Sequence, residues 1–133
     1  MENDIKFKLD LSSEKRFFTR KFLNNLSDEI NLDLDKFISK LHSELLVTGF
    51  YKSGLNKQEF VDFVNKILST GSVITITPQQ VLKKNSQDLL AMGNLTITRK
   101  KILILEGSVE LDIVTSPGVR IKKISFAHRF MIN

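Results

Sequence analysis

The sequence contains no cysteine, and this absence removes several kinds of chemistry at once. Without thiols the chain has no disulfide bonds, no thiolate zinc site and no cysteine nucleophile. Disulfides are rare in reducing compartments, so the composition leaves the compartment open but favours the cytosol.

Long apolar runs are also missing. The N-terminal stretch MENDIKFKLDLSSEKR mixes acids and bases throughout, which does not fit a signal peptide. No stretch of about 18 apolar residues, the length needed for a membrane-spanning helix, occurs in the chain. We therefore expect a soluble, cytoplasmic protein with no membrane partner.

The excess of positive charge is not concentrated in one motif. The formal net charge is +5, and the basic residues are scattered along the chain. The run Arg99, Lys100, Lys101 falls where two predicted strands meet, and lysines are common in such solvated turns. No zinc finger, basic helix or RNA-binding aromatic motif accompanies these residues. Nucleic acid is therefore not an expected partner.

Signals for a cofactor or a metal ion are absent as well. The sequence has no glycine-rich phosphate loop and no nucleophile elbow. The two histidines, His42 and His128, are not at the i, i+4 spacing of a helical metal site. We expect no cofactor and no metal.

Apolar periodicity predicts helices in the first half of one 133-residue domain. After a cap at Ser12 or Ser13, a first stripe comprises Phe18, Phe22, Leu23 and Leu26. A second helix is predicted from Asp33, with its apolar positions at Leu34, Phe37, Ile38, Leu41 and Leu45. A third begins at Asn56, where Glu59 completes a capping box, and ends at Thr70–Ser72.

The second half alternates as β-strands do. Strands are predicted over 73–81, 89–98, 101–114 and 119–132, with the odd positions of 109–113 facing the core. Pro78 predicts an edge or a bulge. The apolar positions of the last strand change parity across Lys122 and Lys123, which predicts a second bulge. Gly93 and Gly107 are further candidates for strong curvature. Residues 5–11 predict a short strand or an extended arm.

This order of elements predicts an α+β, cone-like fold with three N-terminal helices packed on a strongly curved, mostly antiparallel β-sheet. The order and three local stretches resemble the nuclear transport factor 2-like superfamily, which includes ketosteroid isomerase-like and SnoaL-like proteins. The stretches are 33–44, 49–63 and 118–126. The resemblance spans about residues 17–130. It implies a central pocket and frequent dimerisation through the sheet.

The resemblance also implies where isomerase chemistry would lie. The general base would fall at Gly49, which is not an acid. The oxyanion-stabilising tyrosine would fall on the first helix, which offers only Phe18 and Phe22. The second acid would fall at Glu110 or Leu111. Proton abstraction needs a base and oxyanion donors within reach of the substrate, so we do not expect ketosteroid isomerase activity.

Other residues remain as candidates for a site. His128, Asp112 and His42 are the candidate catalytic residues, and each also has an ordinary structural explanation. Ten phenylalanines against one tyrosine and no tryptophan favour either an apolar pocket or an interior filled by side chains. The residues expected to line such a pocket are Phe18, Phe22, Phe37, Leu41, Tyr51, Phe60, Phe126 and His128.

Three functions are compatible with the sequence. The first is a non-catalytic domain that binds a small apolar molecule or a protein partner. The second is an isomerase, dehydratase or cyclase of the SnoaL-like group, so whether the protein is an enzyme stays open. The third is a structural module that forms a homodimer through the sheet.

Overall fold

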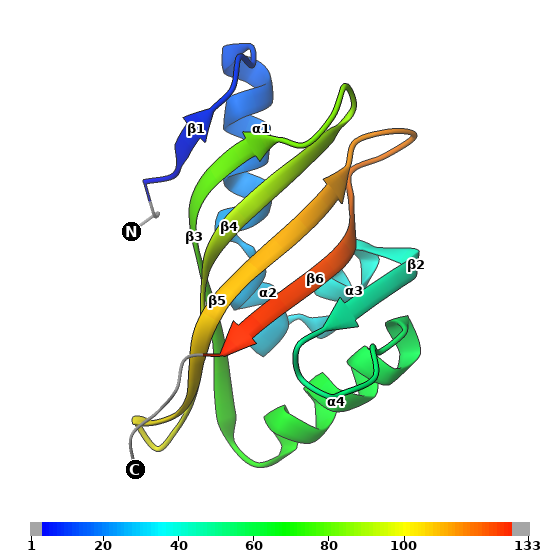
Figure 1. Ribbon diagram of the computed structural model, residues 1–133. Helices are drawn as coiled ribbons and strands as arrows, with labels where there is room; N and C mark the ends of the chain where they lie inside the picture. Colours follow the sequence, from blue (N-terminus) through cyan, green and yellow to red (C-terminus); the bar gives the residue numbers. More distant parts are fainter. Residues whose placement is uncertain (1–3, 129–133) are drawn as a thin grey trace.

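The computed structural model describes residues 4–128 (Figure 1). The elements in chain order are β1 (Lys6–Lys8), α1 (Ser13–Asn24), α2 (Leu26–Leu32), α3 (Leu34–Ser39), β2 (Leu41–Thr48), α4 (Lys57–Ser69), β3 (Ser72–Lys83), β4 (Asp88–Arg99), β5 (Ile102–Val114) and β6 (Arg120–His128). The predicted strand at residues 119–132 therefore corresponds to β6, and its last residues lie outside the described part of the chain.

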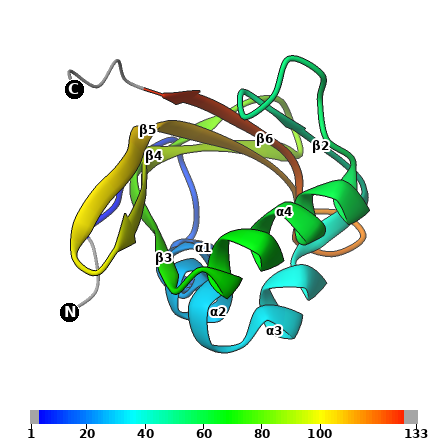
Figure 2. The same ribbon diagram turned by 90° about the horizontal axis from the view of Figure 1, so that it is seen from below.

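Within residues 4–128, one sheet holds all six strands, in the order β1-β3-β4-β5-β6-β2. Strands β3 to β6 are antiparallel neighbours, whereas β1 and β2 join the two edges in parallel. The sheet curves, and helices α1 to α4 lie on its concave side (Figure 2). This arrangement confirms the predicted α+β cone.

Two of the bulges in the described part of the sheet lie where the sequence indicated strong curvature. Pro78 pairs with Gly93 while Gln80 pairs with Met92, so Gln79 is an extra residue in β3. Lys122 is the extra residue in β6, because its neighbours Ile121 and Lys123 pair with adjacent residues of β5. The sequence predicted an edge or a bulge at Pro78 and a bulge at Lys122–Lys123. A bulge bends its strand and increases the local twist.

The core lies between the concave face and the helices. On β5 the buried side chains are at odd positions, including Val109, Leu111 and Ile113, as predicted. The even positions of β4, and those of β5 from Glu106 onward, form the outer face of the sheet. From α1 to α3 the buried residues include Leu23, Leu26 and Phe37. Burial of this apolar surface is the main force that holds the helices on the sheet.

Two helix starts follow the capping expectations. The side chain of Ser12 accepts a hydrogen bond from the backbone N–H of Lys15 at the start of α1. At the start of α4, Asn56 and Glu59 form the predicted reciprocal capping box. Each cap satisfies donors that the first turn of a helix leaves without partners.

The predicted second helix is wrong beyond Ser39. Helix α3 ends at Ser39 with Lys40 as its C-cap, and Leu41, Leu45 and Val47 then point into the core from strand β2. The apolar spacing 34, 37, 38, 41, 45 suits a helix, but residues 41, 45 and 47 also share one face of a strand. Pairing with β6 decides the outcome, since the backbone N–H of Ile121 donates to the carbonyl of Lys40 at 2.7 Å. The residues before Asp33 are also helical, as α2.

The edge of the sheet at β3 is covered rather than open. The hydroxyl of Ser27 bonds both the N–H and the carbonyl of Ile76, at 2.7 and 2.9 Å. One helical turn later, the amide of Asn31 does the same for Ile74, at 3.1 and 2.6 Å. Further along β3, β1 pairs with residues 80–82. Helix α2 therefore replaces a neighbouring strand with two polar side chains, which protects the edge from pairing with another chain.

Candidate functional site

The interior of the cone is filled by side chains. Between α4 and the concave face the structure leaves an apolar cavity of about 20 Å³, large enough for about one water. Its wall includes Phe50, Phe60, Phe63 and Ile124. Phe50 stacks on Phe126 with ring centroids 4.6 Å apart and contacts Phe63 at 5.0 Å. The aromatic residues here occupy the space in which a central ligand would lie.

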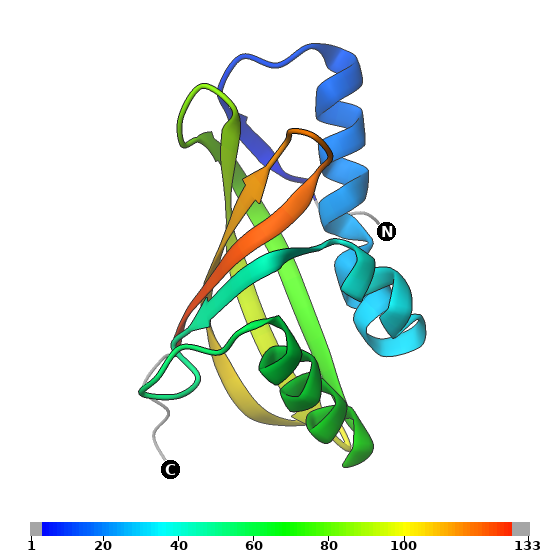
Figure 3. The ribbon, with the colours of Figure 1, turned by 90° about the vertical axis from the view of Figure 1, so that its right-hand side faces the viewer.

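An open cleft of about 750 Å³ lies at the other end of the cone. Its walls are the segment before α1, the first half of α1, the β3–β4 turn and the β5–β6 turn. Figure 3 shows both turns facing the first half of α1. This volume is within the range of small-molecule sites.

The cleft has an apolar wall and a mixed polar rim. Apolar side chains come from Leu9, Leu11, Phe18, Leu89 and Val119. Phe18 is 52% exposed although it lines the cleft. The centre of its ring lies 6.4 Å from the centre of the Phe22 ring. The rim carries two cations and two acids, together with amides and hydroxyls. The charged rim residues are Lys15, Lys83, Asp10 and Glu14.

Hydrogen bonds and an ion pair hold the β3–β4 turn, which forms one wall of the cleft. Asn85 Oδ1 accepts hydrogen bonds from the backbone N–H groups of Gln87 and Asp88. Thr115 donates to the carbonyl of Gln87 at 2.5 Å, which joins this turn to the end of β5. Lys84 forms an ion pair with Asp112 of β5. The hydrogen bond that Lys84 donates to the Asp112 carboxylate raises the pKa of Lys84 above its usual value.

The opposite wall, α1, is held more sparsely. Residues 13–18 of α1 are all exposed. On its far side, the guanidinium groups of Arg16 and Arg20 lie over the ring of Phe7 in β1, at 5.9 and 5.2 Å from its centroid. The cleft therefore lies between the β3–β4 turn, which is fixed by hydrogen bonds, and the first half of α1, whose side chains are exposed.

The three candidate catalytic residues lie apart. Asp112 is on the outer face and is paired with Lys84. His128 is exposed at the end of β6, where its ring stacks on Phe126 at 6.4 Å. His42 does not end a helix as predicted: it lies in β2, and its Nδ1 accepts a hydrogen bond from the N–H of Glu44 at 2.9 Å. The structure brings none of these three residues together with another as an acid–base set.

The predicted pocket residues separate into distinct environments. Phe18 lines the open cleft, and Phe60 lines the small cavity. Four others are buried in the core: Phe22, Phe37, Leu41 and Phe126. Tyr51 is 56% exposed and meets the edge of Phe63 at 5.6 Å. His128 is exposed beside Phe126.

The positions that the resemblance aligned with isomerase groups carry no acid that faces the interior. Gly49 has φ of +103°, and a Cβ there would be 1.8 Å from the carbonyl oxygen of Phe126. Any other residue at position 49 would therefore clash with β6. Leu111 faces the core, whereas Glu110 is exposed on the outer face. Phe18 and Phe22 occupy α1 where a tyrosine would be needed.

The sequence did not reveal a buried ion pair between α2 and the C-cap of α3. Glu29 of α2 and Lys40 after α3 have side chains only 6% and 14% exposed, with Oε1 and Nζ 2.7 Å apart. Glu29 occupies a position one turn after the core residue Leu26, and this spacing is the one signal that could have indicated its burial.

No helix within residues 4–128 has the length and apolarity needed to cross a membrane. In the same range, no three acidic or histidine side chains gather as metal ligands would.

No protein-family model and no curated protein matches the sequence. Solved structures do match it. A domain of unknown function with a cystatin-like fold from Nostoc punctiforme superposes with a TM-score of 0.74 at 14% identity, over 92% of this chain and 82% of that chain. An NTF-2 like protein of unknown function from Shewanella oneidensis gives 0.69 at 14% identity, over 85% and 98%.

A third match is a ketosteroid isomerase-like protein from Erwinia carotovora, with a TM-score of 0.69 at 9% identity over 91% of this chain and 100% of that chain. Together these likenesses define the class: the chain has the nuclear transport factor 2-like fold that the sequence resemblance indicated. At such low identity they establish the fold alone, because one fold carries many unrelated functions.

Proposed function

We propose that this protein binds a small, largely apolar ligand in the open cleft between α1 and the β3–β4 and β5–β6 turns. The observation that carries the proposal is Phe18, a half-exposed phenylalanine inside a cleft of about 750 Å³. A ligand that covered this ring would bury apolar surface that the protein alone leaves in water. The filled interior around Phe60 offers no comparable space.

The rim indicates what kind of ligand fits. Lys15 and Lys83 are balanced by Asp10 and Glu14, so the rim does not select strongly for one sign of charge. Leu9, Leu11, Leu89 and Val119 extend the apolar surface around Phe18. An apolar molecule with one polar end, directed to the amides and hydroxyls of the β3–β4 turn, suits this lining.

A matched pair of variants tests the proposal. Nile red, a neutral dye that fluoresces in apolar sites, serves as the probe. Phe18→Ser is expected to weaken dye binding roughly tenfold or more, because a buried Phe contributes about 1.5–3 kcal/mol. Phe17→Ser is the control variant, since Phe17 is 66% exposed on the same helix and is not part of the cleft lining. Equal affinity for the dye in wild type and Phe18→Ser would contradict the proposal.

A homodimer through the outer face of the sheet is the second candidate. Leu82, Leu90 and Asp112 lie side by side across β3, β4 and β5, and Met92 is opposite Glu110 in the next row. Met92→Lys tests this candidate. In the monomer the new ammonium would lie beside Glu110 on the outer face, whereas in the dimer it would be buried in the sheet-to-sheet interface. Sedimentation should show a dimer for wild type and a monomer for the variant. A wild-type monomer at micromolar concentration contradicts the dimer.

An isomerase, dehydratase or cyclase activity is supported less well, because His42, Asp112 and His128 lie in separate places. If the protein is an enzyme that uses its best candidate base, His128→Ala should abolish turnover. The cytoplasmic location stays a prediction, which fractionation of cells that express the full protein would test.

A further inference from the structure

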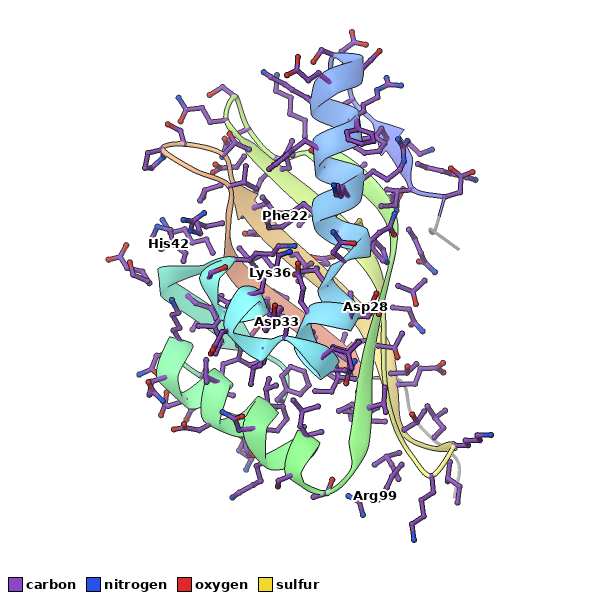
Figure 4. All side chains as sticks on the ribbon, turned by 180° about the vertical axis from the view of Figure 1, so that it is seen from behind. Phe22, Asp28, Asp33, Lys36, His42 and Arg99 are labelled. Carbon is purple, nitrogen blue, oxygen red and sulfur yellow. The ribbon has the colours of Figure 1, made fainter. Side chains whose placement is uncertain are left out.

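The tip of the β4–β5 hairpin combines cations with exposed aliphatic side chains. Arg99, Lys100 and Lys101 supply three consecutive positive charges, and Ile102, Leu103 and Ile104 follow directly. These aliphatic residues are 66%, 39% and 50% exposed. Figure 4 shows Arg99 at the end of the sheet farthest from the start of α1. The tip is therefore separate from the cleft.

The backbone of the turn is unusual for its sequence. Lys100 and Lys101 have φ of 51° and 66°, which is the left-handed region that tight hairpin turns require at both central positions. Asn-Gly is the usual pair there, because residues with a long side chain are disfavoured in this conformation. Two lysines in this turn place two ammonium groups at the outermost point of the hairpin in spite of that cost.

The aliphatic side chains do not share one face. Ile102 is opposite Arg99 and Leu103 is opposite Thr98, so these two consecutive residues point to opposite sides of the hairpin. Ile104 is the extra residue of a bulge between those pairs and Leu105. A flat protein partner could cover only one of the two sides. A fluid layer surrounds the tip and can bury both.

We propose that the β4–β5 hairpin tip inserts into the surface of an anionic lipid bilayer, with its cations at the phosphates and its aliphatic side chains among the upper acyl chains. The charge of the tip is complementary to an anionic leaflet, which attracts each nearby Lys or Arg. The apolar side chains supply the second component that stable surface binding needs. Arg99 anchors the base of the tip to β3, because its Nε donates to Ser72 Oγ at 3.2 Å. This mode requires no membrane-spanning helix.

The chain has no tryptophan, so a single introduced one reports on the tip alone. Leu103→Trp is mixed with vesicles of phosphatidylcholine or of phosphatidylcholine with phosphatidylserine. We expect the emission to shift to the blue with the anionic vesicles only, and the shift to weaken as salt is added. No shift with anionic vesicles at low salt would overturn the proposal. A blue shift that grows with protein concentration without vesicles would also overturn it, in favour of self-association.

Charge variants in the same reporter background identify the cause. Lys100→Asn with Lys101→Gly removes two charges and supplies the pair that this turn prefers, so the variant should fold at least as well. About 1 kcal/mol per cation predicts a loss of roughly fivefold in vesicle partitioning for each lysine. Lys6→Gln with Lys8→Gln in β1 is the control. This double variant also removes two positive charges, but it removes them far from the tip. Equal losses in both variants would show that only the overall charge matters and would reject the site.

The partner class is tested in parallel. A labelled DNA duplex and an acidic polypeptide, polyglutamate, replace the vesicles under the same conditions. The protein could bind the DNA or the polyglutamate, lose that binding in the Lys100→Asn, Lys101→Gly variant, and not bind the anionic vesicles. In that case the hairpin tip recognises a polyanion rather than a bilayer, and the proposal is wrong. Ile102→Thr with Ile104→Thr should weaken vesicle binding, since it removes apolar surface but keeps the charges.

Discussion

The ammonium nitrogen of Lys40 lies 2.7 Å from Oε1 of Glu29, within the helical layer. It also donates to the carbonyl of Phe22 at 3.0 Å and lies 4.5 Å from the centre of that ring. The carboxylate depends on this one cation, because Oε2 of Glu29 has no hydrogen-bond partner among the described residues. Lys40 therefore links α1, α2 and the start of β2 through a single side chain.

We predict that Lys40→Met destabilises the protein by about 3–5 kcal/mol, since it leaves a buried carboxylate without its counter-charge. Replacing both partners, with Glu29→Leu added, should restore most of that loss because no charge then remains buried. Chemical denaturation measures each difference. Lys36→Met, at an exposed position of α3, should change stability by no more than about 0.5 kcal/mol. Full stability in Lys40→Met would show that the ion pair contributes nothing.

The two polar side chains of α2 that cover β3 give a second prediction. Ser27→Ala and Asn31→Ala each leave the N–H and carbonyl of one β3 residue without these partners. Each should cost about 1–3 kcal/mol and should increase aggregation of the partly unfolded protein. Urea midpoints and light scattering measure the two effects. Asp28→Ala, at an exposed position of the same helix, is the control, and an equal effect there would contradict the explanation.

The close approach of β3 and β4 at Gly93 gives a third. A Cβ at this position would lie 2.3 Å from the carbonyl oxygen of Thr77 and 2.9 Å from Cα of Pro78. Gly93→Ala should destabilise the protein by about 1–3 kcal/mol or more, because backbone atoms would have to move. Gly118→Ala is the control, since a Cβ there meets only the flexible side chain of Arg120, at 3.4 Å. The thermal midpoint of each variant decides the comparison.

The ion pair between Lys84 and Asp112 predicts a dependence on alkaline pH. The hydrogen bond with Asp112 raises the pKa of Lys84 above 10.5, with smaller contributions from the charges of Asp112, Asp88 and Glu110. The stability from this pair is thus fully present below pH 10.5 and is lost as the pH rises through the raised value. The effect should be small, because the side chain of Lys84 is 46% exposed.

In urea titrations taken from below to above pH 10.5, Asp112→Asn should lose less stability than wild type does. The difference between the two curves is the readout, since other lysines titrate in both proteins. Identical curves would mean that the pair is too well solvated to contribute. Glu110→Gln removes a weaker neighbouring charge and should change the curve less.

The sequence predicted the strands of the second half closely. Alternation along 109–113 identified the core face, because a strand places successive side chains on opposite sides. The change of parity at Lys122 identified the bulge, because an extra residue is the way for such a strand to keep Ile121 and Ile124 on one face. The capping box at Asn56 likewise depends only on residues three positions apart.

The predictions failed where two local structures fit the same residues. Leu41 and Leu45 are compatible with a helix and with a strand, and pairing of β2 with β6, about eighty residues later in the chain, decides between them. The cleft was not predicted either, because its lining comes from four segments that are distant in sequence. The sequence predicted both Phe18 and Phe22 as pocket-lining residues, and it did not distinguish the ring that stays exposed from the one that is buried.

The sequence by itself determined the alternation of the strands, the caps, the bulges and the amount of apolar surface to be buried, since these depend on neighbours a few residues apart. Only the tertiary structure decided which aromatic residues fill the cone, which one faces the cleft, and that Glu29 and Lys40 meet. Those outcomes depend on how distant segments pack together, and no local pattern encodes that packing.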